Sequence, residues 1–100
     1  DVRWAIGVDK DQYSDGLYGD KSAVLTSMMK RVDVAAYEVA KMTLAGQFPG
    51  GQTLVFSLKN NGVGIPNENP NLSADIVASV NEYAKKIASG ELVVSEIPAK

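Results

Sequence analysis

Two charged side chains follow apolar runs and have the chemistry to bind an oxygen-rich ligand. Asp9 follows "WAIGV" at residues 4–8, and Lys30 follows "AVLTSMM" at residues 23–29. A carboxylate accepts hydrogen bonds from hydroxyl groups, whereas an ammonium group donates them to hydroxyl or ether oxygens. Open α/β sheets bind their ligands at the carboxyl ends of strands, so Asp9 and Lys30 are the candidate ligand-binding residues.

Each of the two residues also has a plainer interpretation. A lone aspartate at a strand end is more commonly a turn residue or a helix cap, and Asp9 fits that role. Lys30 fits a surface lysine near a helix start, where the helix dipole makes a cation slightly unfavourable. The local sequence alone does not decide between these interpretations.

Other chemistry is poorly represented in the sequence. The chain has no Cys and no His, which excludes thiolate nucleophiles, the usual zinc sites and histidine acid–base catalysis. The acidic loop at residues 9–20 fails the EF-hand pattern, because Tyr13 takes the fifth position and Asp20 replaces the final Glu. No carboxylate pair has a convincing catalytic spacing, and "NNGVG" at residues 60–64 lacks the Lys of a phosphate-binding loop. We therefore predict no enzyme activity, no cofactor and no metal.

Charge and hydropathy exclude two further classes of protein. The net charge is −2 and the longest basic runs are pairs of residues, which argues against nucleic-acid binding. No apolar run approaches the roughly 18 residues that span a bilayer. The chain opens directly into a strand pattern without the basic and apolar regions of a signal peptide, so we expect a processed or excised piece of a longer protein.

The elements that must position Asp9 and Lys30 follow from apolar periodicity. Apolar runs predict strands at residues 4–8, 23–29, 53–58 and 91–97. The run at residues 23–29 has an ambiguous period and also fits the opening of a helix. Helical spacing predicts helices at residues 32–45 and 74–89, with Ser73 as an N-cap and glycines after both ends. Residues 9–22 are predicted to form a loop. The alternation of strands and helices, with connections long enough to hold a helix, predicts an α/β fold with a mainly parallel sheet.

Three blocks of the sequence resemble one protein family. They are "IGVDKDQYSDG" at residues 6–16, "VLTSMMKRVDVAAYEVAK" at 24–41 and "LKNNGVGI" at 58–65. Together they resemble the last third of the basic membrane protein family, the purine-nucleoside receptor lipoproteins that serve ABC transporters as substrate-binding subunits. The resemblance covers residues 5–97. It implies a role in capturing purine nucleosides for a permease, on the outer side of the cell membrane.

The resemblance also implies a fold and a site. The expected fold is of the type I periplasmic-binding-protein kind, in which two α/β lobes close on a ligand. Residues 1–100 would form its carboxyl-terminal portion and contribute to both lobes, with lobe crossings near residues 29–31 and 53–60. In relatives the Asp of "GVD" and the Lys of "TSMxKR" contact the ribose hydroxyls, which assigns those contacts to Asp9 and Lys30. The aromatic residues that stack the base, and the lipid anchor, would lie upstream.

Two alternatives and one further expectation complete the interpretation. The same fold could bind a sugar or another ribosyl compound. Alternatively, the chain could be a self-contained interaction or dimerisation domain without a small ligand. If it is a piece of a two-lobed protein, its sheet has a free edge, and we expect copies of the piece to self-associate through it.

Overall fold

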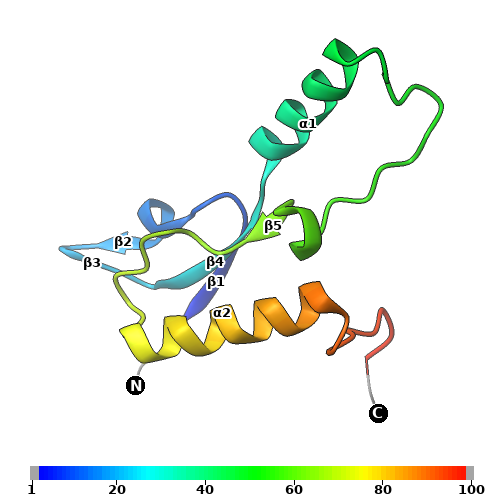
Figure 1. Ribbon diagram of the computed structural model, residues 1–100. Coiled ribbons are helices and arrows are strands. Elements are labelled where there is room, and N and C mark those ends of the chain that lie inside the picture. The colour runs from blue at the N-terminus through cyan, green and yellow to red at the C-terminus, as the bar shows by residue number, and fades with distance from the viewer. Residues whose placement is uncertain (1–2, 99–100) are drawn as a thin grey trace.

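Strand β4 (Val24–Lys30) is the central strand of a three-stranded sheet in the order β1-β4-β5. The computed structural model describes residues 3–98. Strand β1 (Ala5–Asp9) runs parallel to β4, with Asp9 opposite Met29. The carboxyl ends of β1 and β4 therefore lie side by side, and the chain continues from β4 into helix α1 (Figure 1).

The prediction of a mainly parallel sheet is correct for one of its two pairings. Strand β5 (Val63–Gly64) pairs antiparallel with β4, with Val63 opposite Lys30. The reason is that β5 begins beside the end of β4 and runs back along it. The backbone N–H of Arg31 donates to the carbonyl of Gly62 at 2.8 Å, which extends this pairing by one residue.

Both predicted helices are confirmed within one residue of their expected bounds. Helix α1 spans Val32–Leu44 and helix α2 spans Ala74–Ser89. Gly46 and Gly90 have φ angles of 76° and 85°, a left-handed conformation that glycine adopts without steric penalty at a helix end. Ser73 is the N-cap residue of α2, as its sequence position predicts.

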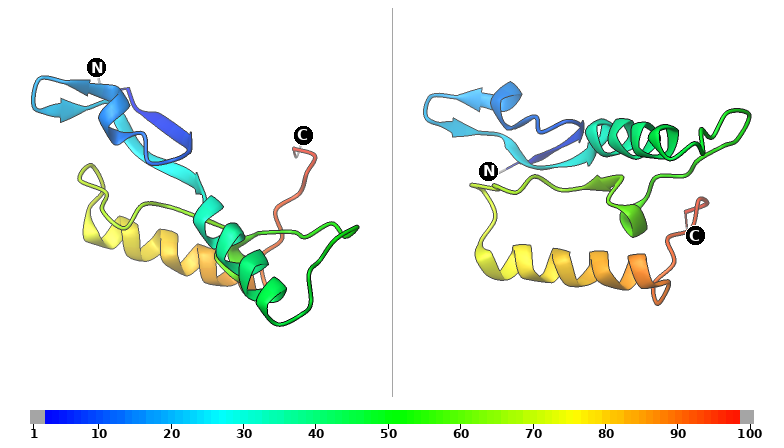
Figure 2. Two further views of the ribbon diagram at one scale, coloured as in Figure 1. Left: turned by 90° about the horizontal axis from the view of Figure 1, so that it is seen from above. Right: turned by 45° about the horizontal axis from the view of Figure 1, so that its top comes forward.

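The two helices are placed differently relative to the sheet. Arg31 is the single residue between β4 and helix α1, and α1 projects away from the sheet (Figures 1 and 2). Helix α2 runs alongside the sheet and contacts the short 3-10 helix η2 (Leu58–Asn60). The chain between α1 and η2 is an extended irregular segment that returns toward the sheet (Figure 1).

Two predicted strands are wrong. Residues 53–57 are irregular and lead into η2, and residues 91–97 are also irregular. A β-prone run becomes a strand only where another strand satisfies its backbone groups, and neither run is paired in the structure. At Ser57 a capping box ends the extended run, because the Ser57 N–H donates to Asn60 Oδ1 at 2.7 Å and the Lys59 N–H donates to Ser57 Oγ at 3.2 Å.

The predicted loop at residues 9–22 contains more structure than the sequence indicates. It holds the 3-10 helix η1 (Tyr13–Gly16) and a small hairpin of β2 (Leu17–Tyr18) and β3 (Lys21–Ser22). Gly19 has a φ of 61° in the hairpin turn, a conformation that favours glycine. These elements are too short to produce an apolar period, so their sequence resembles that of a loop.

The described residues bury little apolar surface. Among residues 3–98, the buried apolar side chains are Val24 and two prolines, Pro49 and Pro66, and the buried polar residues are Ser22 and Ser27. The Cα radius of gyration is 16.5 Å, against about 13 Å for a compact domain of this length. The elongated shape thus leaves apolar side chains of β1, α1 and α2 uncovered. None of the helices in residues 3–98 is long and apolar enough to cross a bilayer.

Candidate ligand-binding site at the strand ends

Asp9 and Lys30 form an ion pair at the carboxyl ends of β1 and β4. Lys30 Nζ lies 3.1 Å from Asp9 Oδ1, and the side chains are 64% and 65% exposed. An exposed ion pair contributes little to folding stability, since solvent screens it. The two residues singled out from the sequence therefore meet in space, with both side chains accessible to a ligand.

The backbone of Asp9 adopts an unusual conformation. Its φ angle is 77°, in the left-handed region that only Gly, Asn and Asp adopt with any frequency. The chain turns at this residue, which also makes the last pairing of β1 with β4. This turn places the carboxylate against Lys30 at the end of the neighbouring strand.

Lys30 has a well-defined backbone because β4 is paired on both sides. Its backbone lies opposite Val63 of β5, while the preceding Met29 lies opposite both Asp9 and Gly64. The central strand thus fixes the Cα position of Lys30. The flexible side chain can then adjust its ammonium group to a carboxylate or to a ligand oxygen.

Arg31, the adjacent cation, pairs with a different part of the chain. Its guanidinium group donates to both carboxylate oxygens of Asp33, from Nε to Oδ1 at 3.2 Å and from Nη2 to Oδ2 at 3.0 Å. The hydrogen bond from Arg31 is the main reason why the pKa of Asp33 is lowered, and the same bond raises the pKa of Arg31. Asp33 lies in the first turn of α1, where a carboxylate favours the helix dipole.

Three residues that the sequence did not single out surround the turn at Asp9. The Val8 N–H donates to Gln12 Oε1 at 2.8 Å, and the Gln12 N–H donates to Ser27 Oγ at 3.0 Å. Ser27 is fully buried and lies opposite Gly7 in the β1–β4 pairing. Gln12 belongs to the block "IGVDKDQYSDG", and its place in that block was the available sequence signal.

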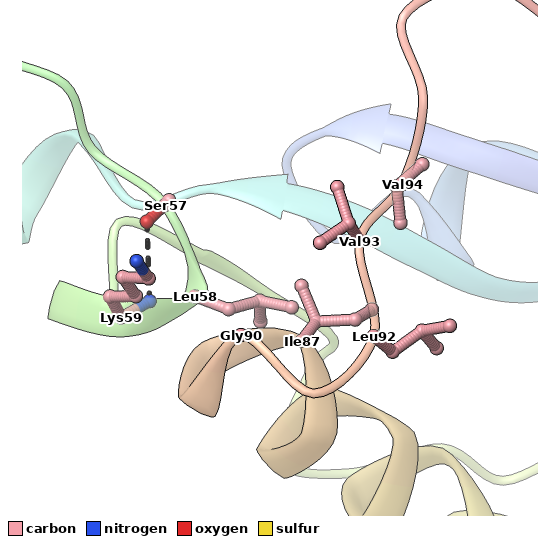
Figure 3. A pocket seen from close by; sticks show the side chains of 8 residues that line it. All are labelled: Ser57, Leu58, Lys59, Ile87, Gly90, Leu92, Val93 and Val94. Carbon is pink, nitrogen blue, oxygen red and sulfur yellow. Dashed lines mark hydrogen bonds between the residues drawn. The ribbon is translucent and has the colours of Figure 1, made fainter.

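Neither of two hollows on the molecule is lined by the residues of the ion pair. One of about 270 Å³ is lined mainly by aliphatic side chains of η2, the end of α2 and the segment that follows it, including Leu58, Ile87 and Leu92 (Figure 3). Another of about 450 Å³ lies between β5, α2 and the end of β4, where Met28 and Arg31 contribute to its lining. Neither includes Asp9 or Lys30. Their mainly apolar linings are typical of uncovered packing surfaces, not of a site that recognises a polar ligand.

Comparison with known proteins identifies the family. Residues 1–97 match the family model named Bmp, described as ABC transporter substrate-binding protein PnrA-like. The chain belongs to this family. The resemblance inferred from the three sequence blocks is thereby confirmed. The Bmp family consists of transporter substrate-binding proteins and is not in general a family of enzymes.

Curated relatives share this similarity over nearly the whole chain. The chain is 41% identical to a "CD4+ T-cell-stimulating antigen" of Listeria innocua over 100 aligned residues, which cover 95% of the chain. It is 34% identical to the "ABC transporter nucleoside-binding protein BmpA" of Lactococcus lactis subsp. cremoris over 99 aligned residues, or 94% of the chain. The alignments cover 28% of the length of each relative.

Proposed function

We propose that residues 1–100 form the carboxyl-terminal part of a two-lobed Bmp-family protein that captures purine nucleosides for an ABC transporter. Membership of the family over residues 1–97 supports the transport role. The printed name of the Lactococcus lactis relative, a nucleoside-binding protein, supports the ligand class. In this proposal the protein is extracytoplasmic, delivers its ligand to a permease, and is held at the cell membrane by a lipid anchor outside this segment.

The observation that carries the proposal is the exposed ion pair of Asp9 and Lys30 at adjacent strand ends. A carboxylate can accept two hydrogen bonds from the vicinal hydroxyls of a ribose, while an ammonium group donates to a hydroxyl or ether oxygen. The pair offers both kinds of partner within one short distance. A ribose thus fits the pair better than an apolar or a purely anionic ligand.

The ion pair also suits a site that closes on its ligand. Enclosing a single charge in a cleft is costly, whereas two opposite charges that already contact each other compensate part of this cost. Once water is excluded, hydrogen bonds from these charged groups contribute about 1.5–3 kcal/mol each. A ligand that lacks one hydroxyl would leave a charged group unsatisfied, which provides selectivity.

The proposed lobe arrangement places Lys30 beside the cleft. We assign the sheet and α2 to one lobe and α1 to the other, with the chain crossing near residues 29–31 and again near 53–60. The support is that Arg31 alone separates β4 from α1, and that α1 projects away from the sheet (Figure 1). Closure of the lobes about such crossings would cover the ion pair and the bound ribose.

Calorimetric titration of guanosine into the full-length protein tests this proposal. Asp9→Ala should weaken binding by about ten- to hundred-fold, because the ribose hydroxyls lose a charged acceptor. 2′-Deoxyguanosine and 3′-deoxyguanosine should bind the parent protein more weakly than guanosine, and this discrimination should largely disappear in Asp9→Ala. Asp20→Ala, which removes a carboxylate from the β2–β3 turn, is the matched control and should bind like the parent.

Each contrary result has a separate meaning. Unchanged guanosine affinity in Asp9→Ala would show that the ribose binds elsewhere. Binding of free sugars with no affinity for guanosine would refute the nucleoside assignment and favour the sugar alternative. A large drop in the ligand-free melting temperature of Asp9→Ala would show that Asp9 is a structural turn residue.

A further inference from the structure

We infer that Gln12 is the positioning residue that holds Asp9 in its left-handed conformation and so directs the carboxylate to the ligand. The positioning role is a property of the ligand-free protein. Its consequence for nucleoside affinity rests on the function proposed above. The structural basis is a set of contacts that joins the loop after β1 to strands β1 and β4.

Gln12 ties the loop of residues 9–12 to the sheet at two points. Its side-chain oxygen accepts from the N–H of Val8, the residue that precedes Asp9, at 2.8 Å. Its own backbone N–H donates to Ser27 Oγ of β4 at 3.0 Å. Since Ser27 is fully buried, this anchor has little freedom to move. The loop is therefore closed on the sheet, with Asp9 at its start.

The packing around Gly7 fixes the place of the Gln12 side chain. A Cβ atom at residue 7 would lie 2.9 Å from Gln12 Cβ and 3.1 Å from Gln12 Oε1, and it would collide with Ser27 Oγ. Ser27 and Gln12 thus occupy the space that a larger residue 7 would take. This explains the glycine in the middle of an apolar strand and makes the loop geometry depend on three residues together.

The other polar groups of the loop are held away from Asp9. Gln12 Nε2 donates to Asp15 Oδ2 at 3.3 Å, and Lys10 Nζ lies 3.3 Å from the same oxygen. The cation next to Asp9 in sequence is consequently paired with Asp15, and Asp9 pairs with Lys30. A non-glycine residue with positive φ persists when its surroundings determine it, and the contacts of Gln12 supply such surroundings.

Gln12→Met in the full-length protein tests the positioning role. Methionine has a similar volume but cannot accept from the Val8 N–H, so residue 9 should leave the left-handed region. The direct readout is the strong intraresidue NOE between the amide proton and Hα that positive φ produces in ligand-free protein. Gln12→Glu retains the acceptor and should restore the NOE. Gln52→Met makes the same change in an exposed irregular segment and should alter nothing.

Nucleoside affinity provides the second readout. Guanosine should bind Gln12→Met about tenfold more weakly, because only a fraction of the protein then presents Asp9 correctly. In the Asp9→Ala background, Gln12→Met should cause no further loss, since its effect acts through Asp9. A purely structural role of Gln12 would instead give additive losses in the double variant.

The outcomes separate this inference from the proposed function. If the NOE persists in Gln12→Met, the positioning role is refuted whatever the affinities are. If Asp9→Ala binds guanosine normally, the proposed site is refuted, while the NOE still decides what holds Asp9. Should Gln12→Met fail to fold, Ser27→Ala removes the other anchor of the loop, and an unchanged NOE there would equally refute the inference.

Discussion

Lys30 and Arg31 are neighbours in sequence but belong to two different regions of the molecule. Lys30 ends the central strand and pairs with Asp9 of another strand, whereas Arg31 precedes α1 and pairs with Asp33 in its first turn. Both contacts are ion pairs of similar length, and Arg31 is the less exposed of the two cations. The two cations therefore differ in what their ion pairs connect: Lys30 links the ends of two strands, whereas Arg31 pairs within the start of one helix.

The two regions are also stabilised differently. The sheet is connected by hydrogen bonds between distant parts of the chain, such as Gln12 to Ser27 and, at the opposite end of β4, Asn71 to the carbonyl of Val24. The side-chain hydrogen bonds of α1 are local, as in Thr43 to the carbonyl of Val39. Tyr37 and Leu44 of α1 are 66% and 91% exposed, so this helix lacks a packing partner among the described residues.

The largest expected effect concerns the 100-residue chain expressed alone. Because its apolar faces are uncovered, it should be expanded or self-associated, and it should bind no measurable guanosine. Size-exclusion chromatography with light scattering, followed by thermal melting, checks this expectation. A compact monomer that melts cooperatively would contradict it and would favour the alternative of a self-contained domain.

The next effect separates the two cations. Lys30→Ala in the full-length protein should weaken guanosine binding by about ten- to hundred-fold, because the ribose loses a charged donor. Arg31→Ala should leave the affinity unchanged, since its guanidinium group is paired with Asp33. Calorimetric titration of both variants measures the contrast. Equal losses in the two variants would show that general positive charge, and not the Lys30 position, matters.

A smaller effect is expected on the free energy of unfolding, when one residue in each region is substituted. Gly7→Ala should lower the free energy of unfolding by about 1–3 kcal/mol, because the added methyl group overpacks the space filled by Ser27 and Gln12. Ala40→Gly on the exposed face of α1 should lower it by about 0.5–1 kcal/mol through backbone entropy alone. Urea denaturation of the full-length variants measures both values. If Gly7→Ala is neutral, the tight packing at Gly7 is not essential.

The smallest effect is the acid response of the Arg31–Asp33 pair. The folded-state pKa of Asp33 lies below its ordinary value of 3.8, mainly because Arg31 donates to it. A lowered pKa stabilises the fold above the unfolded value, and this contribution is lost as the pH falls through the folded value. In Arg31→Ala the pKa of Asp33 should rise toward 3.8, as a carbon-detected NMR titration would show. An unchanged pKa would mean that the hydrogen bond is not maintained in solution.

How much of the fold could be predicted depended on whether the signals were local. Helices α1 and α2 were predicted well because apolar period and terminal glycines are properties of the segment itself. Strands β1 and β4 were also predicted, and they are each other's partners. The runs at 53–58 and 91–97 have similar composition but no partner among the described residues, so their strand propensity was not realised.

The same distinction between local and long-range signals applies to the candidate site. The positions of Asp9 and Lys30 at strand ends followed from the sequence, and their parallel pairing brought them together. The positive φ of Asp9 and the contacts of Gln12 with Val8 and Ser27 did not follow, because they depend on the path of the loop in space. The sequence indicated which residues carry charge, but not what holds them in place.

A crystal structure of the full-length protein with guanosine tests the central claim most directly. We predict that ribose hydroxyl oxygens lie within hydrogen-bond distance, up to about 3.2 Å, of both the Asp9 carboxylate and Lys30 Nζ. Asp9 should retain its positive φ, and Arg31 should remain paired with Asp33. A ribose bound elsewhere, with Asp9 and Lys30 still paired only to each other and open to solvent, would contradict the claim.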